Sequence, residues 1–238
     1  MIEILKKIRT YDDINSLHSD ILSDQKNGAT VISFCNAHAV NLAQKNTEFK
    51  RDLLSSNFLF RDGSGIKIAM RTMNMEPGLN LNGTDFIPAF LDKNQGKTLA
   101  IFGTDEPWLN IAAEKLSNTL DIVITINGFQ DTSTYIDAAK EHKPDIILLA
   151  MGMPKQENVA RTLSEALDYP AIIINGGAIV DFVANRFERA PEYMRDRGLE
   201  WVYRLIKEPK RLFKRYIIGN FTFLIRVGCC YIMNRRKD

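Results

Sequence analysis

The sequence predicts an α/β fold in which helices cover both faces of a mostly parallel sheet. Short apolar runs alternate along the chain with longer segments that have the spacing of amphipathic helices. Strands buried on both faces read as continuous apolar runs, and helices supply the crossovers that parallel strands need. With 238 residues and 45% apolar side chains, the chain can form one such domain with an appendage.

The elements alternate in a regular order. The predicted strands are the apolar runs 30–35, 58–60, 99–102, 122–126, 146–151 and 171–174, of which 58–60 is the weakest. The predicted helices are 12–22, 37–44, 66–72, 85–91, 109–120, 132–141 and 157–167. We expect the helix 12–22 to pack at the edge of the sheet.

Polar and glycine residues follow nearly every predicted strand. In open parallel sheets, ligands bind outside the carboxyl ends of the strands, so these residues are candidates for a nucleotide or sugar site. They are Asn36-Ala37-His38, Arg61-Asp62-Gly63-Ser64-Gly65, Gly103-Thr104-Asp105, Gly152-Met153-Pro154-Lys155-Gln156-Glu157 and Asn175-Gly176-Gly177. Neither G-x-G-x-x-G nor a P-loop occurs, so we expect no nicotinamide or ATP cofactor.

Asp62 is the best candidate for general acid–base chemistry. It lies in a turn where Gly63 and Gly65 would let a ligand approach closely. An equally good interpretation is that Asp62 caps the helix that begins near residue 66. His38 could act as a base or sugar ligand, although a single histidine without a partner is more often structural.

The charge of the chain is unevenly distributed. Residues 186–238 contain 14 basic and 6 acidic side chains, a net charge of +8, whereas residues 1–185 carry −6. This asymmetry predicts an anionic partner: nucleic acid, a membrane surface or a phosphorylated substrate. The glycine pair Gly176–Gly177 could present backbone N–H groups to phosphate, or could be only a tight turn before a solvated basic helix.

No metal-binding pattern is visible: there is no H-x-x-x-H, no Cys/His cluster and no D-x-D pair. A diphosphate leaving group would then need Arg, Lys and backbone N–H groups. Arg204, Arg211 and Arg215 would share one face of a continuous helix. Pro209 is expected to break or kink that helix, which leaves the shared face open.

The segment 216–233 is apolar apart from Asn220, Thr222 and Arg226. The central arginine argues against a membrane span, whereas flanking basic residues and aromatics favour an interfacial helix. The alternative is a helix packed on the domain or in a contact between copies of the chain. The N-terminus has no long apolar core, and Cys35, Cys229 and Cys230 form no disulfide framework. Both features predict a cytoplasmic protein.

Seven motifs in order resemble those of the WecG/TagA/CpsF glycosyltransferases (glycosyltransferase family 26). They are F-x-N-A-H at 34–38, R-D-G-x-G at 61–65, N-G-T-D at 82–85, G-M-P-K-Q-E at 152–157, the glycine pair 176–177 with D-F at 181–182, R-A-P at 189–191, and G-L-E-W-V-Y-R-L-x-x-E-P-x-R at 198–211. The resemblance covers roughly residues 31–216. It implies a Rossmann-like sheet and metal-independent, inverting transfer from a UDP-sugar to a polyprenyl-diphosphate-linked acceptor at the cytoplasmic membrane face.

The resemblance also implies residue roles. Asp62 matches the proposed base, Asn36 and Gln156 match sugar contacts, and Arg204 and Arg211 match arginines that neutralise the departing diphosphate. A third such position appears as Lys214, with Arg215 beside it. The motifs and strand ends together give the expected substrate-binding residues Asn36, Gly63, Asn82, Thr84, Asp85, Gly103, Gly152, Lys155, Gln156, Glu157, Gly176, Gly177 and Arg189.

The chain departs from the family pattern at two positions near the expected sugar site. Phe34 stands where some members have threonine, and Asn80 stands where some have arginine. The donor or acceptor sugar could therefore differ from that of other members.

We expect a catalytic domain at 1–194 and an appendage at 195–238 that completes the active site and binds an anionic membrane. The rival interpretation is a non-catalytic regulator that binds a nucleotide sugar or RNA. No RNA-binding motif with interleaved aromatics is evident, so we expect no nucleic-acid partner.

Overall fold

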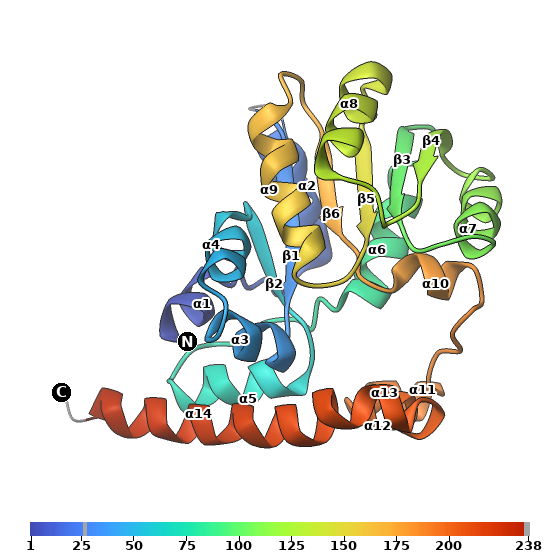
Figure 1. Ribbon diagram of the computed structural model, residues 1–238. Helices are drawn as coiled ribbons and strands as arrows, with labels where there is room; N and C mark the ends of the chain where they lie inside the picture. Colours follow the sequence, from blue (N-terminus) through green and yellow to red (C-terminus); the bar gives the residue numbers. More distant parts are fainter. Residues whose placement is uncertain (26–27, 236–238) are drawn as a thin grey trace.

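The computed structural model describes residues 1–25 and 28–235, and its centre is a six-stranded sheet (Figure 1). The strands are β1 (Thr30–Cys35), β2 (Phe58–Arg61), β3 (Thr98–Gly103), β4 (Asp121–Ile126), β5 (Ile146–Ala150) and β6 (Ile172–Asn175), in the order β2-β1-β6-β5-β3-β4. Every neighbouring pair is parallel. The six predicted strands are confirmed to within one residue at each end, and the sheet is all-parallel.

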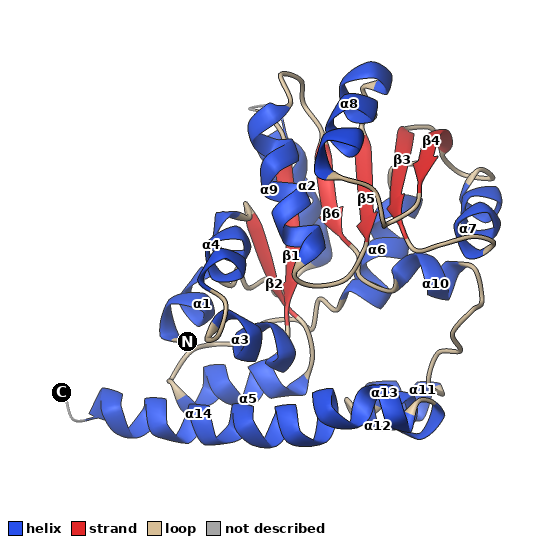
Figure 2. Cartoon of the chain, viewed as in Figure 1, coloured by secondary structure: helices blue, strands red, loops and turns tan. Residues whose placement is uncertain are grey.

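Helices cover both faces of this sheet (Figure 2). They are α1 (Ile2–Lys7), α2 (Ile14–Gln25), α3 (Ala37–Ala43), α4 (Thr47–Ser55), α5 (Ser64–Thr72), α6 (Gly83–Asp92), α7 (Trp108–Leu116), α8 (Thr132–His142), α9 (Lys155–Ala166), α10 (Ile179–Val183), α11 (Glu192–Asp196), α12 (Glu200–Lys207), α13 (Pro209–Phe213) and α14 (Gly219–Arg235). A π-helical turn, Lys214–Ile218, joins α13 to α14. The sequence pattern did not predict α1 and α4.

Alternate residues of each strand pack on opposite faces of the sheet. On one face, Ile32 and Phe34 join a core that α2, α6, α7 and α10 cover. On the other, Val31 packs with residues of α8 and α9. The helix predicted at the sheet edge is α2, and that placement is wrong: α2 lies over β1, the second strand, because Leu17 and Ile21 pack beside Ile32.

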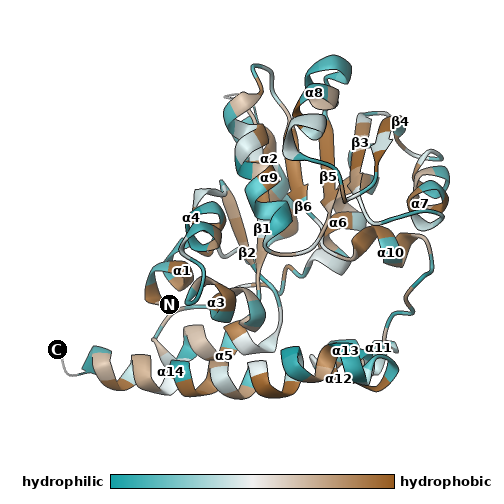
Figure 3. Ribbon diagram, viewed as in Figure 1, coloured by the Kyte–Doolittle hydropathy of each residue, from teal (hydrophilic) through white to brown (hydrophobic). Residues whose placement is uncertain are grey.

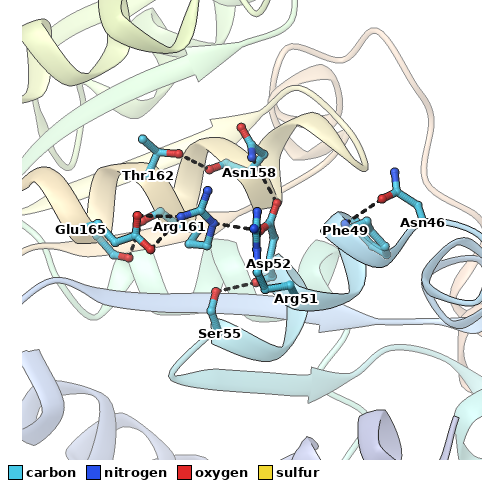
Figure 4. A network of polar contacts seen from close by, with 10 residues as sticks. Asn46, Phe49, Arg51, Asp52, Ser55, Asn158, Arg161, Thr162 and Glu165 are labelled. Atoms are coloured by element: carbon cyan, nitrogen blue, oxygen red, sulfur yellow. Dashed lines mark hydrogen bonds and ion pairs between the residues drawn. The ribbon is translucent and has the colours of Figure 1, made fainter.

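The helices α4 and α9 are joined by a buried carboxylate (Figure 4). The side chain of Asp52 is 2% exposed, and its Oδ1 accepts hydrogen bonds from Arg161 Nε at 2.8 Å and Arg51 Nη2 at 3.0 Å. Its Oδ2 accepts from Asn158 Nδ2 at 3.2 Å. Removing one partner would leave a buried charge short of compensation, which is costly.

The helix α14 lies along the side of the molecule toward which the strands point (Figure 1). Asn41 Nδ2 donates to the Gly219 carbonyl at 2.7 Å, and the buried Phe223 and Val227 join the core formed by α1, α3 and α5. Among the residues described, the helical stretch Pro209–Arg235 is long and apolar enough to cross a membrane, by length and composition only.

The helix α14 also carries exposed apolar side chains, namely Phe221, Leu224, Ile225, Ile232 and Met233, and brown segments recur along its ribbon (Figure 3). The helix therefore packs on the domain and also presents an apolar face, two arrangements that the sequence offered as alternatives. Arg236 and Lys237, expected to strengthen membrane binding, lie outside the described residues. The division of the chain at residues 194 and 195 stays a prediction.

Candidate functional site

A cleft of about 630 Å³ opens at the carboxyl ends of the strands. Ten of the predicted site residues line it: Asn36, Asp62, Thr84, Gly152, Gln156, Gly176, Gly177, Arg204, Arg211 and Arg215. Eight others lie outside its lining: Gly63, Asn82, Asp85, Gly103, Lys155, Glu157, Arg189 and Lys214. We call Asn36, Asp62, Gly152, Gln156 and Gly177 the strand-end wall, and Arg204, Arg211 and Arg215 the arginine wall.

Asp62 and Asn36 meet because β1 and β2 are neighbours, with Cys35 paired to Arg61. The Asp62 N–H donates to the Cys35 carbonyl at 2.9 Å, and Asn36 Nδ2 donates to Asp62 Oδ2 at 3.1 Å. Asn36 is itself fixed, because its Oδ1 caps α3 by accepting from the Ala39 N–H at 3.0 Å. The carboxylate of Asp62 is thus held at a set position in the cleft.

Asp62 does not cap α5, whose N-cap is Gly63 with φ +93°. Burial raises the pKa of the Asp62 carboxyl above its ordinary value, while the hydrogen bond from Asn36 and the charge of Arg215 act in the opposite direction. A carboxylate with a raised pKa binds a proton more strongly than an exposed aspartate does. The site therefore suits Asp62 as a general base.

Hydrogen bonds from Arg61 and to Asn80 fix the backbone next to Asp62. The buried guanidinium of Arg61 donates to the carbonyls of Pro77 and Gly78, each at 3.0 Å. Asn80 Oδ1 accepts from Arg61 Nη1 at 3.1 Å and from the Gly63 N–H at 2.9 Å. Arg61, which stands in the same R-D-G motif as Asp62, was not among the predicted site residues.

Gln156 ties together the turns after β5 and β6. Its Oε1 accepts from the Gly177 N–H at 3.0 Å and the Gly152 N–H at 3.2 Å. The Gly176 N–H donates to the Leu149 carbonyl at 2.7 Å. The N–H groups of the glycine pair, considered as phosphate donors from sequence, therefore already have partners within the protein.

Glu157 lies under this amide and is 1% exposed. Gln156 Nε2 donates to Glu157 Oε1 at 3.0 Å, while Glu157 Oε2 has no hydrogen-bond partner among the described residues. Burial raises the pKa of Glu157 to about 7, against the effect of the Gln156 hydrogen bond. Glu157 therefore supports Gln156 from inside the protein.

Several predicted binding residues outside the cleft lining bond to other parts of the protein. Lys155 Nζ donates to the carbonyls of Gly128 at 2.9 Å and Gln130 at 2.8 Å. Asn82 caps α6 by accepting from the Asp85 N–H at 3.0 Å, and Arg189 Nη1 pairs with Asp85 Oδ1 at 2.7 Å.

Gly103 shows why one strand end must be glycine. A Cβ there would overlap the Ala150 carbonyl of the neighbouring strand β5. Its φ of +154° is also one that L side chains rarely adopt.

The arginine wall comes from three short elements. The helix breaks at Glu208, and Pro209 occupies the first turn of α13, as the sequence predicted. The break and the following π-helical turn nevertheless bring Arg204, Arg211 and Arg215 to one cleft. Lys214 is exposed and lies outside the cleft lining.

Aromatic rings support this wall. Arg204 lies over the Phe182 ring at 5.3 Å and Arg211 over the Phe187 ring at 5.7 Å, and the two rings pack edge to face. Burial lowers the pKa of Arg215, whose Nε has no partner among the described residues. Guanidinium groups around a cleft can receive phosphate oxygens.

The cleft is also lined by His38, which the sequence favoured as structural, and by Arg186, for which no site role was predicted. His38 lines it, and burial with the charge of Arg215 lowers its pKa to about 4, so the ring is neutral at pH 7. Arg186 Nη1 pairs with Asp181 Oδ1 at 3.1 Å, which also accepts from Thr104 Oγ1 at 2.7 Å. The signal for Arg186 was its place in the basic segment.

The described residues contain no group of three or more His, Cys, Asp or Glu side chains that could hold a metal ion. Metal independence itself stays a prediction.

Comparison with known proteins adds a family. Residues 5–237 match the glycosyl transferase WecG/TagA/CpsF family. One relative is the N-acetylglucosaminyldiphosphoundecaprenol N-acetyl-beta-D-mannosaminyltransferase of Bacillus subtilis, 29% identical over 208 residues that cover 85% of this chain and 80% of that protein. The enzyme of the same name from Bacillus spizizenii is 25% identical over 199 residues, covering 79% of this chain and 75% of that protein. Because the family match spans nearly the whole chain, this protein belongs to the WecG/TagA/CpsF family and is a glycosyltransferase rather than a non-catalytic regulator.

Proposed function

We propose that the protein transfers a sugar from a UDP-sugar to a polyprenyl-diphosphate-linked acceptor, in the synthesis of a cell-envelope polymer. One observation carries this proposal. A half-buried carboxylate, Asp62, and three arginines, Arg204, Arg211 and Arg215, line the same cleft. A glycosyl transfer of this kind needs a base at one end of the breaking bond and positive charge at the other.

The proposed step is a single displacement with inversion. The acceptor hydroxyl oxygen attacks the anomeric carbon while Asp62 takes the hydroxyl proton. The bond between that carbon and the diphosphate oxygen breaks, and its electron pair leaves with UDP. Arg204, Arg211 and Arg215 stabilise the charge that develops on the diphosphate, which is the role a metal ion fills in other enzymes.

The donor sugar is proposed by relationship. Both relatives named above transfer N-acetylmannosamine to an undecaprenyl-diphosphate-linked N-acetylglucosamine, according to their names. Asn80 and Phe34 differ from the residues of some family members near the proposed sugar site. An N-acetylmannosamine-type sugar or a hexose is our proposal for the donor.

The acceptor places the reaction at a membrane. We propose that the enzyme works peripherally, at the cytoplasmic face, with the apolar side of α14 on the bilayer. The exposed Phe221, Leu224 and Ile225 support this, as do the basic residues around them. The alternative occupant of this face is a second copy of the chain.

The test is a UDP-release assay with a panel of UDP-sugars, with and without a lipid-linked N-acetylglucosamine acceptor. We expect one donor to release UDP only when the acceptor is present, and equally well in EDTA. Folded protein that releases no UDP from any donor with the acceptor present would contradict the proposal. A requirement for Mn²⁺ or Mg²⁺ would contradict its metal-free part.

A further inference from the structure

The arginine wall has a carboxylate among its guanidinium groups. Glu208 lines the cleft beside Arg204 and Arg211. Its Oε2 accepts from Arg211 Nε at 2.6 Å and its Oε1 accepts from Arg211 Nη2 at 2.8 Å. This two-bond arrangement is the one by which guanidinium groups bind phosphate. The side chain of Glu208 therefore already occupies a face of Arg211 that could receive an anion.

The backbone explains how the carboxylate reaches this position. Glu208 stands at the break between α12 and α13, with φ −131° and ψ 60°, and is the N-cap of α13. The Glu208 side chain accepts no hydrogen bond from an N–H of α13, unlike the short polar side chains that commonly cap helices. It bonds Arg211 instead.

The charges around Glu208 are those of the proposed diphosphate site. The hydrogen bond from Arg211 holds the pKa of Glu208 below its ordinary value, and the charges of Arg204 and Arg186 act in the same direction. Glu208 is therefore an anion at neutral pH. A diphosphate entering the arginine wall would meet a like charge, which disfavours both remaining there.

We propose that Glu208 is a positioning residue that occupies the anion site of the arginine wall when no donor is bound and is displaced by the diphosphate. This rests on the proposed function, in which that wall binds the diphosphate of a nucleotide sugar. While the cleft is empty, Glu208 holds Arg211 over Phe187 and compensates its charge. When UDP is the product, Glu208 competes for Arg211 and favours release.

The test compares binding to the wild-type protein and to Glu208→Gln by calorimetry, with UDP, inorganic pyrophosphate and uridine as probes. Exposed ion pairs are worth up to about 1 kcal/mol, so removing the competing charge should lower the Kd for UDP and pyrophosphate about five-fold. Uridine, which has no phosphate, should bind unchanged. In the Arg211→Ala background the substitution should lose most of its effect.

Glu165→Gln is the matched control. Glu165 also binds one arginine with two oxygens, at 2.7 and 2.6 Å from Arg161 Nη1, but on α9 and outside the cleft lining. It should leave every Kd unchanged. Glu208→Ala repeats the test without an amide, and thermal unfolding confirms that each variant is folded.

The outcomes separate the two proposals. If wild type binds UDP and the Glu208 variants bind UDP and pyrophosphate equally or more weakly, Glu208 only orients Arg211 and the displacement is wrong. If the variants tighten pyrophosphate but no form binds UDP, the displacement stands and the proposed UDP-sugar chemistry is wrong. If neither probe binds any form, both proposals are wrong.

Discussion

The two walls of the cleft are built differently. In the strand-end wall, Gln156 is 3% exposed, and amide hydrogen bonds fix the carboxylate of Asp62 and the glycine turns. In the arginine wall, the Arg211 side chain is 55% exposed, and neither α12, which carries Arg204, nor the preceding α11 has a buried residue among those described. The difference suggests a division of labour, in which a rigid side holds the reacting atoms and an adaptable side receives and releases the diphosphate.

Replacing the base of the rigid wall should have the largest effect. Asp62→Asn keeps the size of the side chain but removes the proton acceptor, so we expect a roughly 10²- to 10⁴-fold loss of turnover with UDP binding retained. Steady-state rates and calorimetry measure both. Asp105→Asn, at the end of β3 but outside the cleft lining, should stay near wild type. Activity within a few-fold of wild type in Asp62→Asn would remove Asp62 from the mechanism.

The pH profile sharpens the same assignment. Because burial raises the pKa of Asp62, the acid limb of kcat/KM should lie above the usual aspartate range of about 3.9 and disappear in Asp62→Asn. His38, with a pKa of about 4, stays neutral through the working range and should not contribute a second limb near pH 6.5.

Substitutions in the adaptable wall should cost somewhat less. Arg204→Ala or Arg211→Ala removes one charged donor to the leaving group, for which we expect a loss of roughly 10- to 10³-fold in turnover even with a soluble acceptor. UDP affinity should fall in parallel, unlike in Asp62→Asn. Arg197→Ala, an arginine of the same appendage that bonds the Tyr193 carbonyl, is the control. Equal rates for the Arg204 and Arg197 variants would exclude Arg204 from the reaction.

Glu157, which bonds Gln156 of the strand-end wall, should make the stability of the protein depend on pH. The pKa of Glu157 is raised from 4.5 to about 7, so the folded state binds a proton that the unfolded state releases between these pH values. The contribution of Glu157 to the free energy of unfolding, measured as the difference between wild type and Glu157→Gln, should therefore fall by about 3 kcal/mol as the pH rises from 4.5 to 7, and then level off. Glu157→Gln should remove this slope in urea titrations at pH 5 to 8. An unchanged slope would mean that Glu157 is not the titrating group.

The sequence predicted the sheet and its strand ends better than the C-terminal segment that carries the arginine wall. Continuous apolar runs predicted the positions of all six strands, because strands that helices cover on both faces are apolar at successive residues. The strand ends then placed Asp62, Asn36 and Gln156 at one edge. The helix α4 was missed although Asn46 caps it and Phe49 and Leu53 lie on its buried face. Its contact with α9 was not predictable, because it depends on Asp52 and Arg161, two residues far apart in sequence.

The roles of single residues were harder to predict. Nothing in a one-dimensional pattern shows that the Gly177 N–H is already bonded to Gln156, or that Arg189 pairs with Asp85. The arginines at 204–215 were predicted to bind an anion because the charge of a side chain can be read from the sequence without knowledge of the backbone. Their convergence was not predictable, since it depends on the break at Glu208 and a π-helical turn.

The smallest expected effect concerns the solvent-exposed side chains of α14. Phe221, Leu224 and Ile225 are exposed on α14, opposite the buried Phe223 and Val227. Deleting 217–238 would remove Phe223 and Val227 from the core as well, so substitutions on the exposed face are the cleaner test of membrane binding.

Replacing Phe221, Leu224 and Ile225 together by Gln removes apolar contact with the bilayer but leaves the core and the arginine wall in place. With partial insertion worth about 25 cal/mol per Å² of apolar surface, we expect roughly ten-fold weaker partition to anionic liposomes in flotation. UDP binding should not change. Ile14→Gln, which changes an exposed apolar residue of α2, should float like wild type. If the triple variant also floats like wild type, α14 does not hold the enzyme at the membrane by this face. The C-terminal segment would then bind the diphosphate only.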